Sequence, residues 1–248
     1  MKQNLVKTFK WTVKIALAVT FGLVALTFLK SDWTKIQKIE LVQSAGSSQI
    51  LFERIQNSLA DDIKKAEGRR VWEVSLKELR NLVQKDRRVK NVAIHREFPS
   101  AVKVEIETYS PVLAFLDSDG KMYPVATDAT LLPAVSSQEG FDVPILRGEG
   151  VRENIEVREA AIQLLSHAPE SGGISRKSIS EIVYDKNNGF KVFLAGANTE
   201  VRLGDTDFGL KVSRVAKVLS YLENQNIKSR VIDASFSKKV VVRARNAP

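Results

Sequence analysis

Few side chains in this 248-residue chain have the types and spacing that chemistry requires. It contains two histidines, His95 and His167, and no cysteine. Histidine transfers protons or binds metals, but these two lie in different parts of the chain with no carboxylate pattern between them. The lack of cysteine excludes disulfides, thiolate metal sites and cysteine nucleophiles. We therefore predict neither a metal site nor a catalytic histidine.

One acidic motif has the spacing of a calcium loop. Asp117 and Asp119 precede Gly120, as at the start of such a loop. An EF-hand also needs glycine at its sixth position and glutamate at its twelfth, where this chain has Met122 and Ala129. The motif instead favours a hairpin turn. No glycine-rich phosphate loop or serine nucleophile elbow occurs either, so we predict a protein without cofactor that is not an enzyme.

An apolar run near the N-terminus predicts a membrane anchor. Residues 11–29 read WTVKIALAVTFGLVALTFL, with a single charge at Lys14. As a helix they extend roughly 28 Å, close to the thickness of the hydrocarbon core. Lysines concentrate before the run, which favours a cytoplasmic N-terminus. A cleaved signal peptide is the alternative, but the candidate cleavage site at 25–27 lies inside the apolar run, which favours an uncleaved anchor.

Small residues lie on one side of this predicted helix. Ala18, Gly22 and Ala25 follow the spacing i, i+4, i+7. Such a stripe lets a second membrane helix approach closely. The alternative is that membrane helices are simply rich in glycine and alanine.

The net charge of +9 does not indicate nucleic-acid binding. Residues 1–30 contain lysines and no acid, so much of the excess belongs to the tail and anchor. The rest of the chain mixes both signs of charge, without a basic stripe of stacking aromatics. We predict a mixed protein surface and no nucleic-acid partner.

After the anchor, residues 36–110 have the pattern of a small α+β module. A strand over 38–43 precedes a helix with Phe52, Ile55 and Leu59 on one stripe. A second helix begins at the capping box formed by Ser75 and Glu78. Two strands follow, joined by a turn at 98–100, and the second strand alternates apolar and charged residues. The predicted order is strand, helix, helix, strand, strand.

Residues 111–246 predict a second, mixed β module with flanking helices. Strands at 112–116 and 122–125 flank the turn at 117–120, and a hairpin at 179–195 turns at 187–189. Helices are expected at about 152–166 and 207–224. The end of the module is predicted as two strands, 231–236 and 239–245.

These motifs resemble the bacterial cell division family FtsQ/DivIB. The run VKNVAIHREFPSAVKVEI, residues 89–106, is similar to the POTRA domain of that family. Residues 132–133, 143–148 and 201–204 are similar to the β domain that follows it. The chain departs from the family pattern at Arg87, where proline is usual, at Thr108, where glutamate is common, and at Leu113, where alanine is usual.

The resemblance implies an α+β fold with a defined domain order. It comprises a cytoplasmic tail (1–10), a transmembrane helix (11–29), a linker (30–35), a POTRA domain (36–110) and a β domain (111–246). It also implies a single-pass protein of the inner membrane at the division septum, with its C-terminus in the periplasm. In this family such a protein is a non-enzymatic scaffold that links early and late division proteins and septal peptidoglycan synthesis.

The family's partners are coiled-coil membrane proteins of the FtsB and FtsL type. Its last strands and the preceding helix receive FtsB. Carried over by position, this contact set consists of Arg214, Phe236, Lys238, Lys239, Val240, Val241, Val242 and Arg243. In the POTRA domain, Arg87, Arg88 and Lys90 are the candidate surface for other division proteins, and an ordinary solvated surface is the alternative.

The terminal strand supports two interpretations from its pattern alone. Val240, Val242 and Ala244 share one face, while Lys239, Val241, Arg243 and Arg245 share the other. At a sheet edge, its open backbone groups would accept a partner strand, and its cations would attract an acidic segment. Lysine and arginine are equally the residues that protect an edge from pairing. The alternative functions are a single-POTRA chaperone acting by strand addition and a membrane-tethered wall hydrolase.

Overall fold

The structure is a computed structural model that describes residues 11, 14–23, 33, 35–135, 141–196 and 198–245. The chain divides into two compact units, with the boundary between Thr108 and Tyr109. Each unit has its own hydrophobic core.

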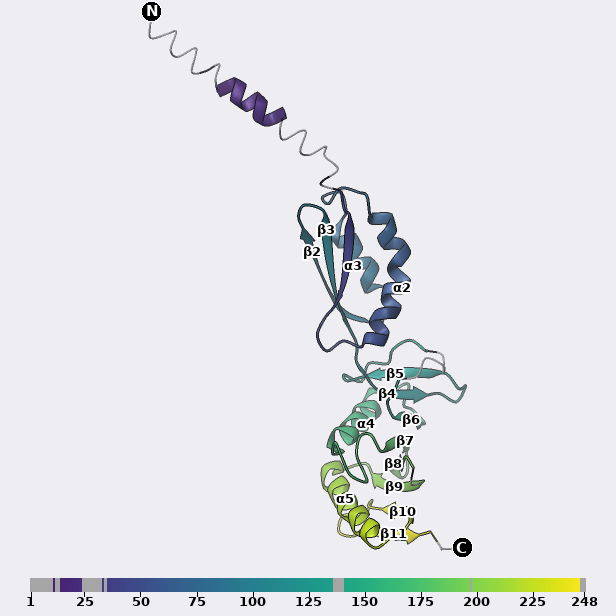
Figure 1. Ribbon diagram of the computed structural model, residues 1–248. Coiled ribbons are helices and arrows are strands. Elements are labelled where there is room, and N and C mark those ends of the chain that lie inside the picture. The colour runs from purple at the N-terminus through teal and green to yellow at the C-terminus, as the bar shows by residue number, and fades with distance from the viewer. Residues whose placement is uncertain are drawn as a thin grey trace, which may run out of the picture. The chain divides into compact units, whose positions relative to one another are not determined.

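Within the described residues, the first unit is a three-stranded sheet with two helices (Figure 1). Its elements are β1 (Lys38–Gln43), α2 (Gln49–Ala66), α3 (Leu76–Gln84), β2 (Val89–Glu97) and β3 (Ala101–Thr108). Strand β3 is central; it pairs parallel with β1 and antiparallel with β2. The predicted order of elements is thus the observed one.

Hydrophobic periodicity explains how these elements pack. Val102, Val104 and Ile106 alternate along β3 and are fully buried because successive side chains of a strand point to opposite faces. Helix α2 buries Leu51, Ile55 and Leu59, whereas Phe52 is only partly buried. Helix α3 begins after Ser75, whose side-chain oxygen accepts the N–H of Glu78 as predicted.

Thr108 joins two segments of this unit that lie far apart in the sequence. It is buried, and its hydroxyl accepts the N–H of Ser48 at 2.9 Å and donates to the Ser48 carbonyl at 3.2 Å. Its own N–H donates to the hydroxyl of Ser47. Ser48 is the N-cap of α2 and makes no side-chain cap of its own. Thr108 therefore fastens the end of β3 to the start of α2.

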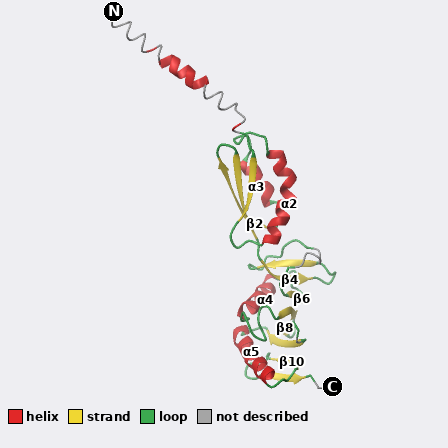
Figure 2. Ribbon diagram, in the orientation of Figure 1, coloured by secondary structure: helices red, strands yellow, loops and turns green. Residues whose placement is uncertain are grey.

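The second unit is one mixed sheet covered by two helices, as far as the residues are described (Figure 2). Its strands run in the spatial order β11-β10-β9-β8-β7-β6-β4-β5. The pairs β4–β6, β6–β7 and β9–β10 are parallel, and the other neighbouring pairs are antiparallel. The elements are β4 (Pro111–Leu116), β5 (Met122–Ala126), β6 (Ile145–Gly148), α4 (Ile155–His167), β7 (Ile179–Asp185), β8 (Gly189–Leu194), β9 (Thr199–Gly204), α5 (Phe208–Asn224), β10 (Ser229–Asp233) and β11 (Val241–Ala244).

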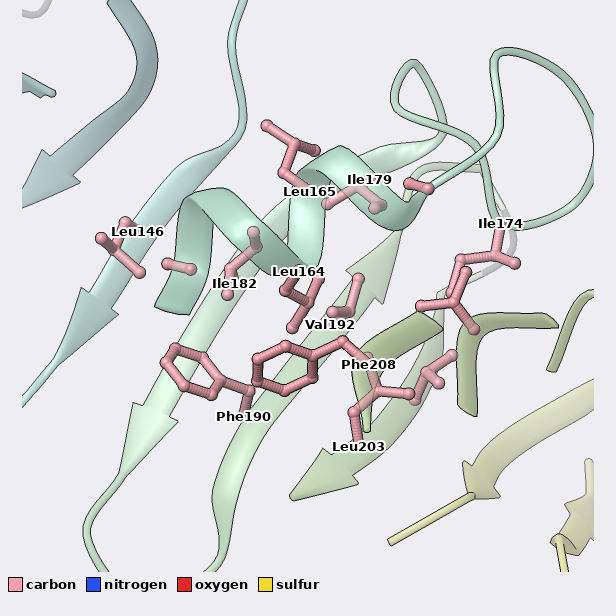
Figure 3. Close-up of a cluster of buried hydrophobic side chains, with 14 of the residues drawn as sticks. Leu146, Leu164, Leu165, Ile174, Ile179, Ile182, Phe190, Val192, Leu203 and Phe208 are labelled. Carbon is pink, nitrogen blue, oxygen red and sulfur yellow. The ribbon is translucent and has the colours of Figure 1, made fainter. Parts of the chain in front are cut away.

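The core of the second unit lies between the sheet and its helices (Figure 3). Leu164 of α4 lies beside Val192 of the sheet, and both belong to one buried cluster with Leu165 and Ile182. The ring of Phe190 packs edge-on against Phe208, with ring centroids 5.6 Å apart. Aromatic pairs favour this geometry because the positive ring edge meets the negative face.

Helix α4 begins later than its pattern predicts. The helix expected from about residue 152 starts at Ile155, and Asn154 caps it by accepting the N–H of Glu156 at 2.8 Å. The preceding residues form a turn that starts with the close approach of Gly148 to β7. A Cβ at Gly148 would lie 2.3 Å from the carbonyl oxygen of Tyr184, and its φ is +139°. Glycine is therefore required there.

The predicted membrane anchor is described only in part. Residues 14–23 are helical, and most of their side chains are exposed. Among the described residues, no helix has the length and apolar character needed to cross a bilayer. The tail 1–10 and the remainder of the predicted span, Ala25 included, lie outside the described residues.

Candidate functional site

The terminal strand β11 lies at one edge of the eight-stranded sheet. Among the described residues it pairs on one side only, with β10. Its sequence position alone does not impose this, because a last strand can also insert between others. A strand with an unpaired side presents backbone donors and acceptors to any extended segment that approaches.

The opposite edge of the same sheet is covered. Residues 130–135 fold back along β5, forming isolated bridges from Met122 to Val135 and from Val125 to Leu131. The Val135 N–H donates to the Met122 carbonyl at 2.8 Å, and the Leu132 N–H donates to the Pro124 carbonyl at 2.9 Å. Of the two described edges of this sheet, β11 is therefore the open one.

The register of β11 shows which of its backbone groups face outward. The Arg245 N–H donates to the Lys228 carbonyl, toward β10. Val241 lies opposite Asp233, and Arg243 lies opposite Val231. Because backbone groups alternate in direction along a strand, the N–H and C=O of Val242 and Ala244 point away from β10.

The two faces of β11 differ as predicted. Val240 and Val242 pack against the hydrophobic core, whereas Val241 is 39% exposed and Arg243 is exposed on the other face. The strand is shorter than the predicted segment 239–245. It covers Val241–Ala244, so Lys239 and Val240 belong to the preceding loop. A partner strand paired with β11 would thus extend the sheet beside apolar side chains on one face and cationic side chains on the other.

The predicted contact residues outside β11 lie in or against the loop that leads to it. The ammonium of Lys239 stacks on the ring of Phe236, 4.9 Å from its centroid. The guanidinium of Arg214, on α5, donates to the carbonyl of Ser237 in this loop. Arg214 thereby fixes the loop to the helix, a role that its sequence position does not reveal. The structure brings the whole predicted contact set together beside β11.

The cations around β11 form no ion pair with the carboxylates that the structure describes. Among the described residues, no ion pair involves Lys238, Lys239, Arg243 or Arg245. Within the described part of the chain, their charges are therefore not neutralised by an ion pair. An unneutralised cluster attracts an acidic partner and accelerates its association. We call Phe236, Ser237, Lys238, Lys239 and β11 the terminal edge.

The cations of the predicted POTRA surface differ from those of the terminal edge in their ion pairing. The Nε of Arg88 donates to the two carboxylate oxygens of Asp86 at 2.9 and 3.1 Å. Lys90 pairs with Glu107 at 2.8 Å across the sheet. Arg87 is exposed and forms no ion pair among the described residues. Of the three cations, two are thus neutralised by carboxylates of the same unit.

The pairing with Arg88 changes the pKa of the Asp86 carboxyl group. Burial alone would raise the pKa of its carboxyl group, but the hydrogen bonds and charge of Arg88 outweigh that effect and hold the pKa below its usual value. Asp86 also accepts the Arg88 backbone N–H at 2.9 Å. The pair therefore stabilises the turn between α3 and β2.

The side chains that could take part in catalysis or metal binding lie apart from one another. His95 is exposed on β2, and His167 is exposed at the end of α4. In the part of the chain that is described, no three histidine or acidic side chains lie close enough to hold a metal. Asp117 instead pairs with Arg152 at 2.7 Å, and Arg152 stacks on Tyr123. The predicted turn motif is thus part of a surface ion pair beside a groove of about 840 Å³.

Sequence reasoning missed two contributors to the terminal edge. Ala244 supplies outward backbone groups, and the Ser237 carbonyl anchors the loop through Arg214. The alternating pattern of the terminal strand would have been sufficient to add Ala244 to the predicted contact residues. No sequence signal identifies Ser237, because its contribution is a backbone atom.

Comparison with known proteins places the two units in one family. Residues 36–109 match the FtsQ-type POTRA domain, and residues 114–235 match the C-terminal domain of cell division protein FtsQ/DivIB. The chain is 25% identical to cell division protein FtsQ of Geotalea daltonii over 217 residues, which cover 80% of this chain and 78% of that protein. It is 28% identical to FtsQ of Anaeromyxobacter sp. over 151 residues, 58% of this chain and 50% of that protein.

A third relative carries the name DivIB. Cell division protein DivIB of Staphylococcus aureus is 24% identical over 192 residues, which cover 76% of this chain and 39% of that protein. The two matched domains follow each other in the order of the two structural units. The chain therefore belongs to the FtsQ/DivIB family of cell division proteins.

Proposed function

We propose that this protein is a non-enzymatic scaffold of the division machinery, anchored by a single membrane span. Its N-terminus lies in the cytoplasm, and its two units lie in the periplasm at the septum. It links early and late division proteins and septal peptidoglycan synthesis through protein contacts. The open edge at β11 is the observation that supports this proposal most directly.

The terminal edge receives an extended segment of an FtsB-type partner, which is itself paired with an FtsL-type protein. The segment adds a ninth strand through the N–H and C=O groups of Val242 and Ala244. Lys238, Lys239 and Arg243 favour acidic side chains in the partner, because among the described residues no carboxylate pairs with them. Val241 offers an apolar contact between these charges.

A proline substitution tests strand addition directly. Ala244 is exposed, and its N–H points away from β10. Ala244→Pro removes this outward donor while leaving the inward bonds of Arg243 and Arg245 in place. We expect at least a tenfold loss of affinity for the coiled-coil partner pair of the same organism, measured by titration of the purified full chain in detergent.

Ala244→Thr is the matched control, because it keeps the N–H and suits a strand. It should bind like the parent, and both variants should unfold at the parent's temperature. Undiminished binding by the stably folded Ala244→Pro variant would rule out strand addition at this edge.

Localisation tests the role in division separately. A fluorescent fusion of the full chain should collect at midcell in dividing cells, and the Ala244→Pro variant should still reach the membrane. Uniform membrane fluorescence of the parent fusion would contradict a scaffold at the septum.

A further inference from the structure

One end of the first unit carries exposed aromatic side chains. Phe98 is 72% exposed, Trp33 is 56% exposed and Trp72 is 40% exposed. Large aromatics are usually buried, so a cluster of exposed ones calls for an explanation. All three come from segments that surround the start of β1.

Backbone hydrogen bonds hold these segments together. The Ile36 N–H donates to the Arg69 carbonyl at 2.8 Å, and the Gly68 N–H donates to the Ile36 carbonyl at 3.0 Å. The Gln37 N–H donates to the Ser100 carbonyl at 2.9 Å. The loop after α2, the turn between β2 and β3, and the start of β1 therefore share one end of the unit. We call this the entry end.

Trp72 is displayed by a fixed loop. Val71 and Val74 of this loop are buried in the core. The guanidinium of Arg96 donates to both of their carbonyls at 3.0 Å, which ties the loop to β2. Trp72, between the two valines, consequently remains partly exposed on a rigid support.

The entry end also carries basic side chains beside these aromatics. Residues 35–40, 67–75 and 96–100 contain five basic residues and four carboxylates. The basic residues are Lys35, Lys38, Arg69, Arg70 and Arg96, and the acids are Glu40, Glu67, Glu73 and Glu97, of which Glu40 pairs with Lys38 and Glu73 with Arg70. Exposed aromatics beside lysine and arginine are the combination that favours the interface of an anionic membrane.

If residues 11–29 span the bilayer as predicted, the short linker after them keeps this end near the lipid. Six residues, 30–35, separate the predicted membrane span from Ile36, which is buried in the first unit. Fully extended, six residues reach about 20 Å. The other end of β3, where Thr108 meets Ser47 and Ser48, lies at the opposite end of the same unit.

We propose that the entry end rests on the anionic headgroup layer of the membrane, with Trp72 and Phe98 in its interfacial region. The apolar rings gain a partly dehydrated environment, while the neighbouring cations contact lipid phosphates. This contact fixes the orientation of the first unit relative to the bilayer. The inference rests on the membrane anchor of the proposed function.

Tryptophan fluorescence in vesicles tests this contact with the full chain. In the Trp11→Phe, Trp33→Phe variant, Trp72 is the remaining tryptophan of the sequence. The variant is reconstituted into vesicles that contain phosphatidylglycerol and lipids brominated on their acyl chains. Bromine quenches tryptophan only on close approach. We expect Trp72 to be quenched severalfold more than a reporter in the second unit, with emission at shorter wavelength.

The distal reporter is Tyr221→Trp in a chain with Trp11, Trp33 and Trp72 all changed to phenylalanine. Tyr221 is 62% exposed on α5. Equal quenching of Trp72 and this reporter would overturn the inference. Replacing phosphatidylglycerol by phosphatidylcholine should reduce the quenching of Trp72, and unchanged quenching would overturn the role of anionic headgroups.

A third variant separates the inference from the anchor. The Trp33→Phe, Trp72→Phe variant keeps Trp11, at the start of the predicted span. Quenched Trp11 with unquenched Trp72 would leave the anchor in place and overturn the headgroup contact. Absence of quenching for both would overturn the anchor and the contact together.

Discussion

Cations that look alike in the sequence differ in the structure by whether a carboxylate lies beside them. Arg88 and Lys90 are paired with Asp86 and Glu107. The basic residues around β11 have no such neighbour among the described residues. A charge that is already neutralised adds little attraction for a partner. At the residue scale, the basic residues around β11 thus differ from Arg88 and Lys90 in lacking a carboxylate partner among the described residues.

The pairing of Asp86 predicts a pH dependence of stability. Its pKa is lowered in the folded state, so its contribution is present above the ordinary carboxyl pKa of about 3.8 and is lost as pH falls through the lowered value. We expect Asp86→Asn to reduce the free energy of unfolding by about 1 kcal/mol at pH 7, a modest figure because solvent screens a partly exposed pair. Urea unfolding at pH 7 and at pH 3 measures this.

Asp61→Asn serves as the control for this measurement, because Asp61 is exposed on α2 and forms no ion pair among the described residues. It should leave unfolding unchanged at both pH values. A loss for Asp86→Asn that is as large at pH 3 as at pH 7 would show that its charge is not the cause.

At the scale of elements, a strand extends only as far as its neighbour offers hydrogen bonds. The terminal pattern alternates over seven residues, yet β11 comprises four, Val241–Ala244. Its neighbour β10 spans Ser229–Asp233, so residues before Val241 have no partner strand. The loop residues are instead held by Arg214 and by the stacking of Lys239 on Phe236. A bound partner strand would supply the missing pairing.

The link between β3 and α2 predicts a cost for losing one hydroxyl. Thr108→Val keeps the shape of the side chain but leaves the N–H and carbonyl of Ser48 without the Thr108 hydroxyl. We expect a loss of about 1–3 kcal/mol in the free energy of unfolding, because the partly buried N–H of Ser48 would lose its acceptor. Chemical denaturation of the full chain measures the change. Thr127→Val, at an exposed site, should have little effect; equal effects for both would refute the role of the link.

At the scale of the whole molecule, the two hydrophobic cores share no residue. Ile55 and Val104 belong to the first core, whereas Leu164 and Val192 belong to the second. Units with separate cores can unfold separately, because each buries its own set of apolar side chains.

Substitutions in the two cores should therefore act locally. Leu164→Ala removes a fully buried side chain of the second unit and should cost about 2–5 kcal/mol. Hydrogen exchange should accelerate across 111–245 while residues 38–108 keep their protection. Ile55→Ala, in the first unit, should give the reverse pattern. Loss of protection in both units from either substitution would show that they unfold as one.

Local patterns in the sequence determined the type and order of most elements. Alternation identified the buried face of β3, and the Ser75–Glu78 pattern identified the cap of α3. The order of these patterns was also sufficient to suggest the family that the comparisons then showed. Periodicity works here because it depends on neighbours a few residues apart along the chain.

The tertiary structure alone decided the properties of the candidate site. It placed β11 at an open edge, covered the edge at β5 with residues 130–135, and paired Arg88 and Lys90 with carboxylates. These outcomes depend on which distant segments become neighbours. A periodic pattern specifies the face that a residue occupies, but not the strand or charge that lies beside it.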